Sequence, residues 1–157
     1  MHQQVPLVIG LGNSLRSDDG AGMAVAEALA AKASCLSVRV CQQLTPDLAA
    51  EINQAPAVLF IDSVVPGPSN EHRPTLKPIP SIEIEPSHTH AVDPFSHALT
   101  PERLLALTLA LYNHCPPAWQ LLIPGYQWDV GDELSPATHQ ACQEALPLAL
   151  EWVAAHA

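Results

Sequence analysis

The sequence predicts an α/β fold of three layers, with a mostly parallel twisted sheet, helices on both faces and one antiparallel edge strand. Short, nearly continuous apolar runs alternate along the chain with segments whose apolar residues recur at helical spacing, as in βαβ units. The runs lack the strict alternation of a half-exposed strand, which indicates strands covered on both faces. With 157 residues, the chain fits one domain spanning residues 1–157.

Three strands and two helices are expected in the first part of the chain. The apolar runs that suit buried strands span residues 5–11, 35–41 and 57–65. Between the first two runs, residues 21–33 (AGMAVAEALAAKA) have helical spacing. A second helix is expected from Thr45 to about residue 54, because threonine is a favourable N-cap and Pro46 suits the first helical position.

The rest of the chain predicts a loop, an edge strand, a further strand and two helices. Residues 66–80 are rich in proline, glycine and serine, which favours a surface loop. Residues 81–85 (SIEIE) alternate with period two, as in an edge strand with one exposed face. A strand is expected at residues 119–126. Two helices with a hydroxyl cap before proline are expected, from Thr100 to about Asn113 and from Ser135 to the C-terminus.

Charge and composition exclude several classes of partner. Six Lys and Arg against sixteen Asp and Glu give a formal charge of −10, so nucleic acid and an anionic membrane surface are not expected partners. The apolar stretches are too short to cross a bilayer. The four cysteines lack CxxC spacing, and the N-terminus has no basic region of a signal peptide. These features predict free thiols in a reducing cytoplasm.

The turn after the first strand, residues 10–22 (GLGNSLRSDDGAG), is the first candidate for chemistry. Its opening imitates a dinucleotide-binding fingerprint, but Leu15 stands at the third glycine, and neighbouring carboxylates would repel a diphosphate. Asp18 and Asp19 precede the first helix, so one interpretation is that they only cap it. The alternative is a functional role, since Gly20 and Gly22 allow close approach of a partner.

A third carboxylate and a group of histidines follow later in the chain. Asp62 ends an apolar strand, where burial is costly unless the charge is paired or metal-bound, although strand-end aspartates also form turns. His88, His90 and His97 lie within ten residues. Each could be an ordinary solvated histidine, but His97 directly precedes a capped helix. Two carboxylates and one imidazole suit nickel, zinc or cadmium, with open positions for water or substrate.

These segments resemble the hydrogenase maturation proteases, the endopeptidases that trim the large subunit of nickel-iron hydrogenases. Residues 10–22 are similar to the family's signature G-x-G-N-x-L-x-x-D-D/E-x-x-G. Leu59–Asp62 matches its strand-end aspartate, and residues 96–107 (SHALTPERLLAL) match its histidine before a leucine-rich helix. Residues 125–136 also fit, so the resemblance spans nearly the whole chain.

The resemblance implies that Asp19, Asp62 and His97 contact the metal and carry catalysis. It implies that the metal is nickel supplied by the substrate, which zinc or cadmium could replace in the free protein, and that no organic cofactor takes part. The substrate would be a hydrogenase large-subunit precursor, which the protein would cut to release its C-terminal extension. We also expect the protein to be a monomer in the cytoplasm. His88 and His90 remain alternatives to His97.

Two further points stay open. The sequence has no GxSxG elbow and no HExxH motif, so it shows no familiar protease nucleophile or zinc-protease signature. An alternative function is therefore a nickel checkpoint or chaperone that docks on the large subunit without cutting it. Residues 41–46 (CQQLTP) replace the Gly-Gly-Thr segment of many family members, which leaves the identity of the client hydrogenase open.

Overall fold

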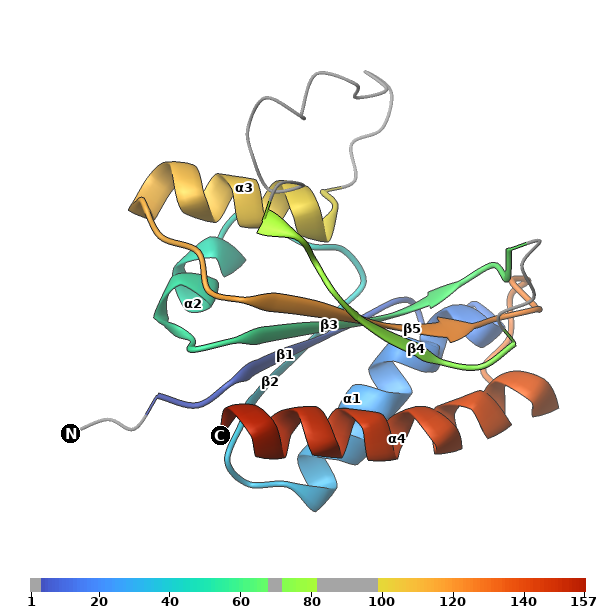
Figure 1. Ribbon diagram of the computed structural model, residues 1–157. Coiled ribbons are helices and arrows are strands. Elements are labelled where there is room, and N and C mark those ends of the chain that lie inside the picture. Colours follow the sequence, from blue (N-terminus) through green and yellow to red (C-terminus); the bar gives the residue numbers. More distant parts are fainter. Residues whose placement is uncertain (1–3, 68–71, 82–98) are drawn as a thin grey trace.

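The computed structural model describes residues 4–67, 72–81 and 99–157 and contains one five-stranded sheet (Figure 1). Its strands are β1 (Leu7–Leu11), β2 (Ser37–Cys41), β3 (Val58–Val64), β4 (Thr75–Pro78) and β5 (Ala118–Pro124). Its helices are the 3₁₀ turn η1 (Ser17–Gly20), α1 (Ala21–Lys32), α2 (Leu48–Gln54), α3 (Pro101–Tyr112) and α4 (Pro136–His156). The strand order is β2-β1-β3-β5-β4, parallel except for the antiparallel pair β4–β5. The predicted fold class is confirmed.

Helices α2 and α3 cover one face of the sheet, and α1 and α4 cover the other (Figure 1). The pleat of the strands decides which residues face which pair of helices. Along β1, Leu7 and Ile9 pack in a core with α2 and α3, whereas Val8 between them packs in a second core with α1 and α4. In β3, Phe60 faces the first core and Ile61 the second. Because both faces are buried, these strands need apolar residues at every position, which explains their continuous runs.

The hydroxyl caps predicted for the last two helices are confirmed. The Thr100 side chain accepts a hydrogen bond from the Arg103 N–H at 3.2 Å. The Ser135 side chain accepts one from the Thr138 N–H at 3.4 Å. A proline stands at the start of both helices, where its missing N–H leaves no bond unmade.

The cap predicted at Thr45 is wrong. Helix α2 begins only at Leu48, and its N-cap residue Asp47 makes no capping bond through its side chain. Leu44 is buried and bridges to Leu99, which keeps the chain extended to that point. The carbonyl of Thr45 then accepts from the Leu48 N–H at 3.1 Å, so the first residues form a turn before the helix.

The antiparallel edge strand lies inside the segment predicted as a loop. Strand β4 pairs with β5 from Thr75 opposite Leu122 to Pro78 opposite Trp119. Pro78 is tolerated because one side of an edge strand makes no hydrogen bonds to a neighbouring strand. Proline and glycine are otherwise typical of loops, which is why the composition predicts a loop here. The edge strand predicted at 81–85 falls mainly on residues outside the described ranges, and Ser81, which is described, is not in a strand.

All four cysteines are described, and none forms a disulfide bond. Their presence as thiols agrees with the sequence prediction. Burial raises the pKa of the Cys115 and Cys142 thiols to about 11, so both stay protonated and weakly nucleophilic near neutral pH. Within the described ranges, no helix combines the length and the apolar character needed to cross a bilayer.

Candidate functional site

A pocket of about 260 Å³ lies at the carboxyl end of the parallel strands. In parallel α/β sheets this is the end where ligands bind. The pocket is lined by Leu11, Gly12, Asp19, Gln42, Gln43, Leu44, Asp62, Leu99, Thr100 and Pro101. The turns after β1 and β2, the end of β3 and the start of α3 therefore meet here. Asp19 and Asp62, 43 positions apart in the printed sequence, line the same pocket, as expected.

Two glycines bring Asp19 against the ends of the strands. Gly12 has φ of +137°, a conformation that side chains rarely adopt, and a Cβ there would run into the backbone oxygen of Asp19. At Gly22, a Cβ would run into the carbonyl oxygens of Leu11 and Ile61. The start of α1 can therefore lie directly on β1 and β3. The Asn13 N–H donates to Asp19 Oδ2 at 3.0 Å and fixes its carboxylate.

Asp62 is half-buried beside another negative charge. Its Oδ1 accepts from the Ser63 N–H at 2.8 Å. Burial, together with repulsion from the Asp19 carboxylate, raises the pKa of Asp62 to about 6 in spite of that hydrogen bond. Two carboxylates that repel each other in one pocket form a favourable place for a cation, and carboxylate oxygens are ligands for divalent metals.

A third ligand is not found within the described residues. No group of three His, Cys, Asp or Glu side chains that could hold a metal occurs in ranges 4–67, 72–81 and 99–157. The sequence candidates for the nitrogen ligand, His88, His90 and His97, all lie outside those ranges. Two of the three predicted site residues are thus brought together, and the position of His97 stays a prediction.

Asp18 has a different role from its neighbour. Its side chain is fully buried and accepts hydrogen bonds from the N–H groups of Tyr126, Gln127 and Ser135, at 2.7, 2.8 and 2.7 Å, and from the Ser135 hydroxyl at 2.8 Å. Burial raises the pKa of Asp18, but the four bonds outweigh it and leave the pKa below 3.8. Asp18 therefore ties η1 to the loop after β5 and to the start of α4.

The capping interpretation of the two aspartates is wrong. The N-cap of α1 is Gly20, which has no side-chain capping bond. Instead, the backbone turns at Ser17, directly before both aspartates, where φ is +53°. That left-handed conformation costs about 1–2 kcal/mol for a residue other than glycine. Bonds from the Ser17 N–H to Gly131 O at 2.9 Å and from its hydroxyl to Asp129 O at 2.8 Å help to hold it.

Sequence reasoning missed Gln42 and Gln43 as residues of the pocket. In the sequence they stand out only because they replace the Gly-Gly-Thr segment of the family that the chain resembles. Their position directly after β2 was a usable signal, because the rule that pointed to Asp62, at the carboxyl end of β3, applies equally there. Their amides supply neutral donors and acceptors beside the two carboxylates.

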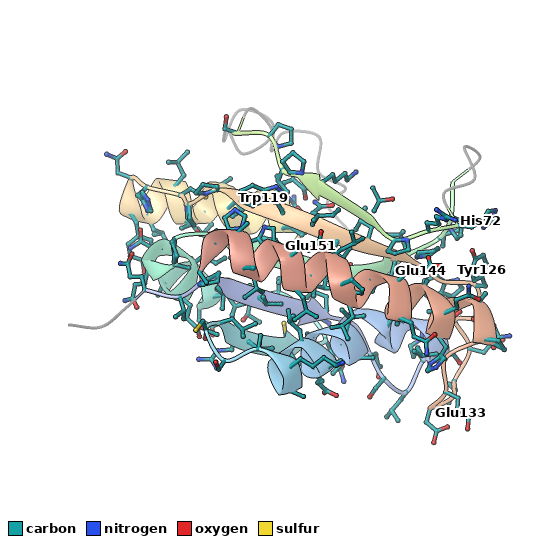
Figure 2. The ribbon with its side chains drawn as sticks, turned by 60° about the horizontal axis from the view of Figure 1, so that its bottom comes forward. His72, Trp119, Tyr126, Glu133, Glu144 and Glu151 are labelled. Carbon is teal, nitrogen blue, oxygen red and sulfur yellow. The ribbon has the colours of Figure 1, made fainter. Side chains whose placement is uncertain are left out.

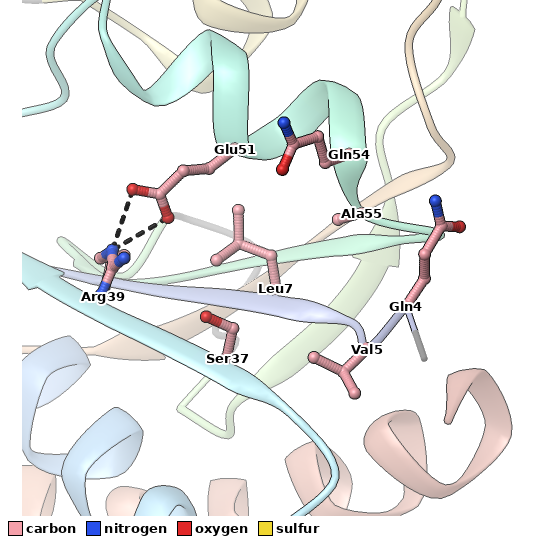
Figure 3. Close-up of a pocket in the computed structure, with 8 residues that line it drawn as sticks. All are labelled: Gln4, Val5, Leu7, Ser37, Arg39, Glu51, Gln54 and Ala55. Carbon is pink, nitrogen blue, oxygen red and sulfur yellow. Dashed lines mark hydrogen bonds and ion pairs between the residues drawn. The ribbon is translucent and has the colours of Figure 1, made fainter. Parts of the chain in front are cut away.

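A larger pocket of about 540 Å³ lies at the opposite end of the sheet (Figure 3). It is lined by the first residues of β1 and β2 and by the end of α2. Arg39 and Glu51 form an ion pair there, 2.9 Å from Nε to Oε2, and both side chains are exposed. The pair satisfies its own charges, and the pocket lies away from the carboxyl ends of the strands, which favours the smaller pocket as the functional site.

The raised pKa of Asp62 predicts a pH-dependent gain in stability for Asp62→Asn. Ionising this carboxyl in the folded state costs free energy. That cost is absent below the unfolded pKa of 3.8 and complete above about pH 6. The free energy of unfolding of Asp62→Asn should therefore exceed that of the wild type by up to about 3 kcal/mol at neutral pH. At about pH 3.5 the two should be nearly equal. Urea unfolding at both pH values tests this, and a pH-independent difference would contradict it.

No protein-family model matches the chain, and neither does any curated protein sequence. Solved structures do match. The hydrogenase maturating endopeptidase HybD from E. coli superposes with a TM-score of 0.77 at 16% identity, over 97% of this chain and 93% of that one. The [NiFe] hydrogenase maturation protease HybD from Thermococcus kodakarensis gives 0.73 at 22% identity, over 96% and 99%. The [NiFe] hydrogenase maturation protease HycI from Thermococcus kodakarensis superposes with a TM-score of 0.71 at 15% identity, over 96% of this chain and 93% of that one. The chain thus has the fold expected from the resemblance.

Proposed function

We propose that this protein is an endopeptidase of hydrogenase maturation, which removes the C-terminal extension of a [NiFe] hydrogenase large-subunit precursor after recognising its bound nickel. The observation that carries the proposal is the pair Asp19 and Asp62 in one pocket at the carboxyl end of the sheet. Solved structures with the same fold are named hydrogenase maturation endopeptidases or proteases. Two independent features, the site and the fold, therefore support one function.

His97 is the best candidate for the third ligand. Leu99 and Thr100 line the pocket. His97 is only two residues before Leu99 in the sequence, and two residues of even a fully extended chain span about 7 Å at most. His90 is nine residues before Leu99, and no such short tether ties it to the pocket. Chain connectivity thus favours His97 over the two other histidines.

The three side chains suit a metal that arrives with the substrate. Two carboxylate oxygens and one imidazole nitrogen leave coordination positions open, so the ion can keep ligands from the precursor. Nickel held in this way polarises the neighbouring carbonyl group or activates water. A carboxyl with a pKa of about 6, as at Asp62, is also suited to accept a proton near neutral pH. Zinc or cadmium would occupy the same ligands in the free protein.

The proposal includes no organic cofactor. The pocket volume of about 260 Å³ is below the range of about 300–1,000 Å³ typical of such ligands, and its two carboxylates would repel a diphosphate. The working unit that we propose is a monomer in the cytoplasm, with the large-subunit precursor as its partner.

Mass spectrometry of the nickel-loaded precursor, before and after incubation, tests the proposal. The wild type should shorten the precursor, whereas Asp19→Ala, Asp62→Asn and His97→Ala should process it at least 100-fold more slowly because each lacks one ligand. Asp47→Asn and His114→Ala change exposed residues that do not line the pocket and serve as matched controls. Binding without shortening would instead favour the checkpoint function. Normal processing by all three variants would overturn the site.

A further inference from the structure

We propose that Leu15 and Val130 form a docking surface for the substrate segment beside the cleaved bond, and that this segment has apolar residues flanked by basic ones. The inference rests on the proposed function and deepens it by naming where the polypeptide binds and what chemistry it carries. The docking surface is defined here as the exposed apolar side chains of Leu15 and Val130 together with the acidic residues around them.

The exposed apolar residues are gathered at the functional end of the molecule. Six large hydrophobic side chains are exposed within the described ranges. Four of them, Leu15, Val65, Tyr126 and Val130, lie in the loops that follow β1, β3 and β5. The other two, Leu111 and Tyr112, lie at the last turn of α3, toward the opposite end of the sheet (Figure 1). Scattered exposed hydrophobics need no explanation, but a group around a candidate site indicates an interface.

Backbone pairing sets Leu15 and Val130 side by side. Arg16 and Gly131 form a parallel bridge, and Leu15 and Val130 are the residues directly before them. The Gly131 N–H donates to Leu15 O at 2.9 Å, and the Ser17 N–H donates to Gly131 O at 2.9 Å. The two side chains nevertheless stay 63% and 91% exposed. The protein thus presents two adjacent apolar side chains that its own core does not cover.

The same two loops are hydrogen-bonded to the pocket residue Asp19 and to its neighbour Asp18. Leu15 lies in the turn where the Asn13 N–H donates to Asp19. The loop that carries Val130 is bound to Asp18 through the Tyr126 and Gln127 N–H groups. The docking surface is therefore fixed relative to the pocket, so a bound segment would lose little binding energy to ordering these loops. A polypeptide bound here would lie on the turn between β1 and α1, which also carries Asp19.

Charge favours a basic segment as the occupant. Asp129, Asp132 and Glu133 all lie in the loop of Val130. Arg16 is the one basic residue in stretches 12–20 and 125–135, both fully described. Glu133 and Tyr126 lie at the same end of the molecule in Figure 2. A second copy of this chain, with its net charge of −10, would bring like charges together. A polypeptide with basic residues gains attraction and steering instead.

Steady-state cleavage of the full-length, nickel-loaded precursor tests the docking surface. The double variant Leu15→Ser, Val130→Ser should raise KM about 10-fold or more and leave kcat unchanged, because it removes apolar contacts and no pocket residue. Leu111→Ser with Tyr112→Ser is the matched control, and its KM should stay that of the wild type; Leu111 is 61% exposed, close to the 63% of Leu15. Asp132→Asn with Glu133→Gln should make KM less dependent on salt.

An unchanged KM in the first double variant, or an equal rise in the control, would overturn the docking surface. An unchanged salt dependence would overturn the basic character of the segment. If the wild type cuts no precursor, the proposed function fails. Whether the docking surface binds the precursor is then decided separately, by measuring the Kd of the precursor for the Asp62→Asn protein. There, a Kd raised about 10-fold by Leu15→Ser with Val130→Ser supports the docking surface, and an unchanged Kd rejects it.

Discussion

Asp18→Ala is expected to lower the free energy of unfolding by about 3–5 kcal/mol at neutral pH. The substitution removes a buried carboxylate and leaves the N–H groups of Tyr126, Gln127 and Ser135 without their acceptor. Each of these bonds joins η1 to residues 108 to 117 positions away, so no local rearrangement replaces them. Urea unfolding measures the loss. The control is Asp47→Ala, which changes an exposed aspartate without a capping bond.

The same substitution should change how stability depends on pH. The pKa of Asp18 is lowered by its hydrogen bonds in the folded protein, so its stabilisation is complete above the unfolded value of 3.8. It is lost as the pH falls through the folded pKa. The difference between wild type and Asp18→Ala should therefore be large at about pH 7 and shrink below about pH 3.8. A difference under about 1 kcal/mol at neutral pH would show that Asp18 does not anchor the fold.

The layered fold could be predicted because its strands obey a simple rule. Strands β1 and β3 are buried on both faces, which requires continuous apolar runs that are easily seen in a sequence. Thr100-Pro101 and Ser135-Pro136 fix the starts of α3 and α4 through local bonds. These features depend on neighbours within a few residues, so the sequence carries them directly.

The two errors in the fold come from residues whose structure depends on distant partners. Strand β4 forms because β5, more than forty positions later in the sequence, offers a free edge, and its own composition is that of a loop. Thr45 looks like a cap, but the bridge from Leu44 to Leu99 keeps the chain extended before it. Neither contact leaves a local pattern.

The site could be predicted in part. Asp62 is predictable because burying a carboxylate at the end of a covered strand is costly unless the carboxylate has a partner. Composition alone could not divide the roles of Asp18 and Asp19, and only the resemblance pointed to Asp19. The division comes from Ser17, which turns the chain at φ of +53°, and from the loop after β5, which binds Asp18. Both are features of the folded chain.

Nickel dependence is the largest expected effect on activity. Asp19 and Asp62 line the pocket. Under the proposal, His97 completes the site and the open positions take an ion that the substrate brings, so the protein is not expected to act on peptides in general. Without that ion, Asp19 and Asp62 repel each other and no group polarises the carbonyl to be attacked. Generic peptides should therefore remain uncut, even at high enzyme concentration.

The most direct test of this account is cleavage of one large-subunit precursor prepared with and without nickel, followed by mass spectrometry under otherwise identical conditions. We expect the wild-type protein to shorten the nickel-loaded precursor and to leave the nickel-free precursor at full length. Restoring nickel to the second sample should restore its cleavage. Equal cutting of both precursors would contradict the claim that the two aspartates and a histidine recognise an ion carried by the substrate.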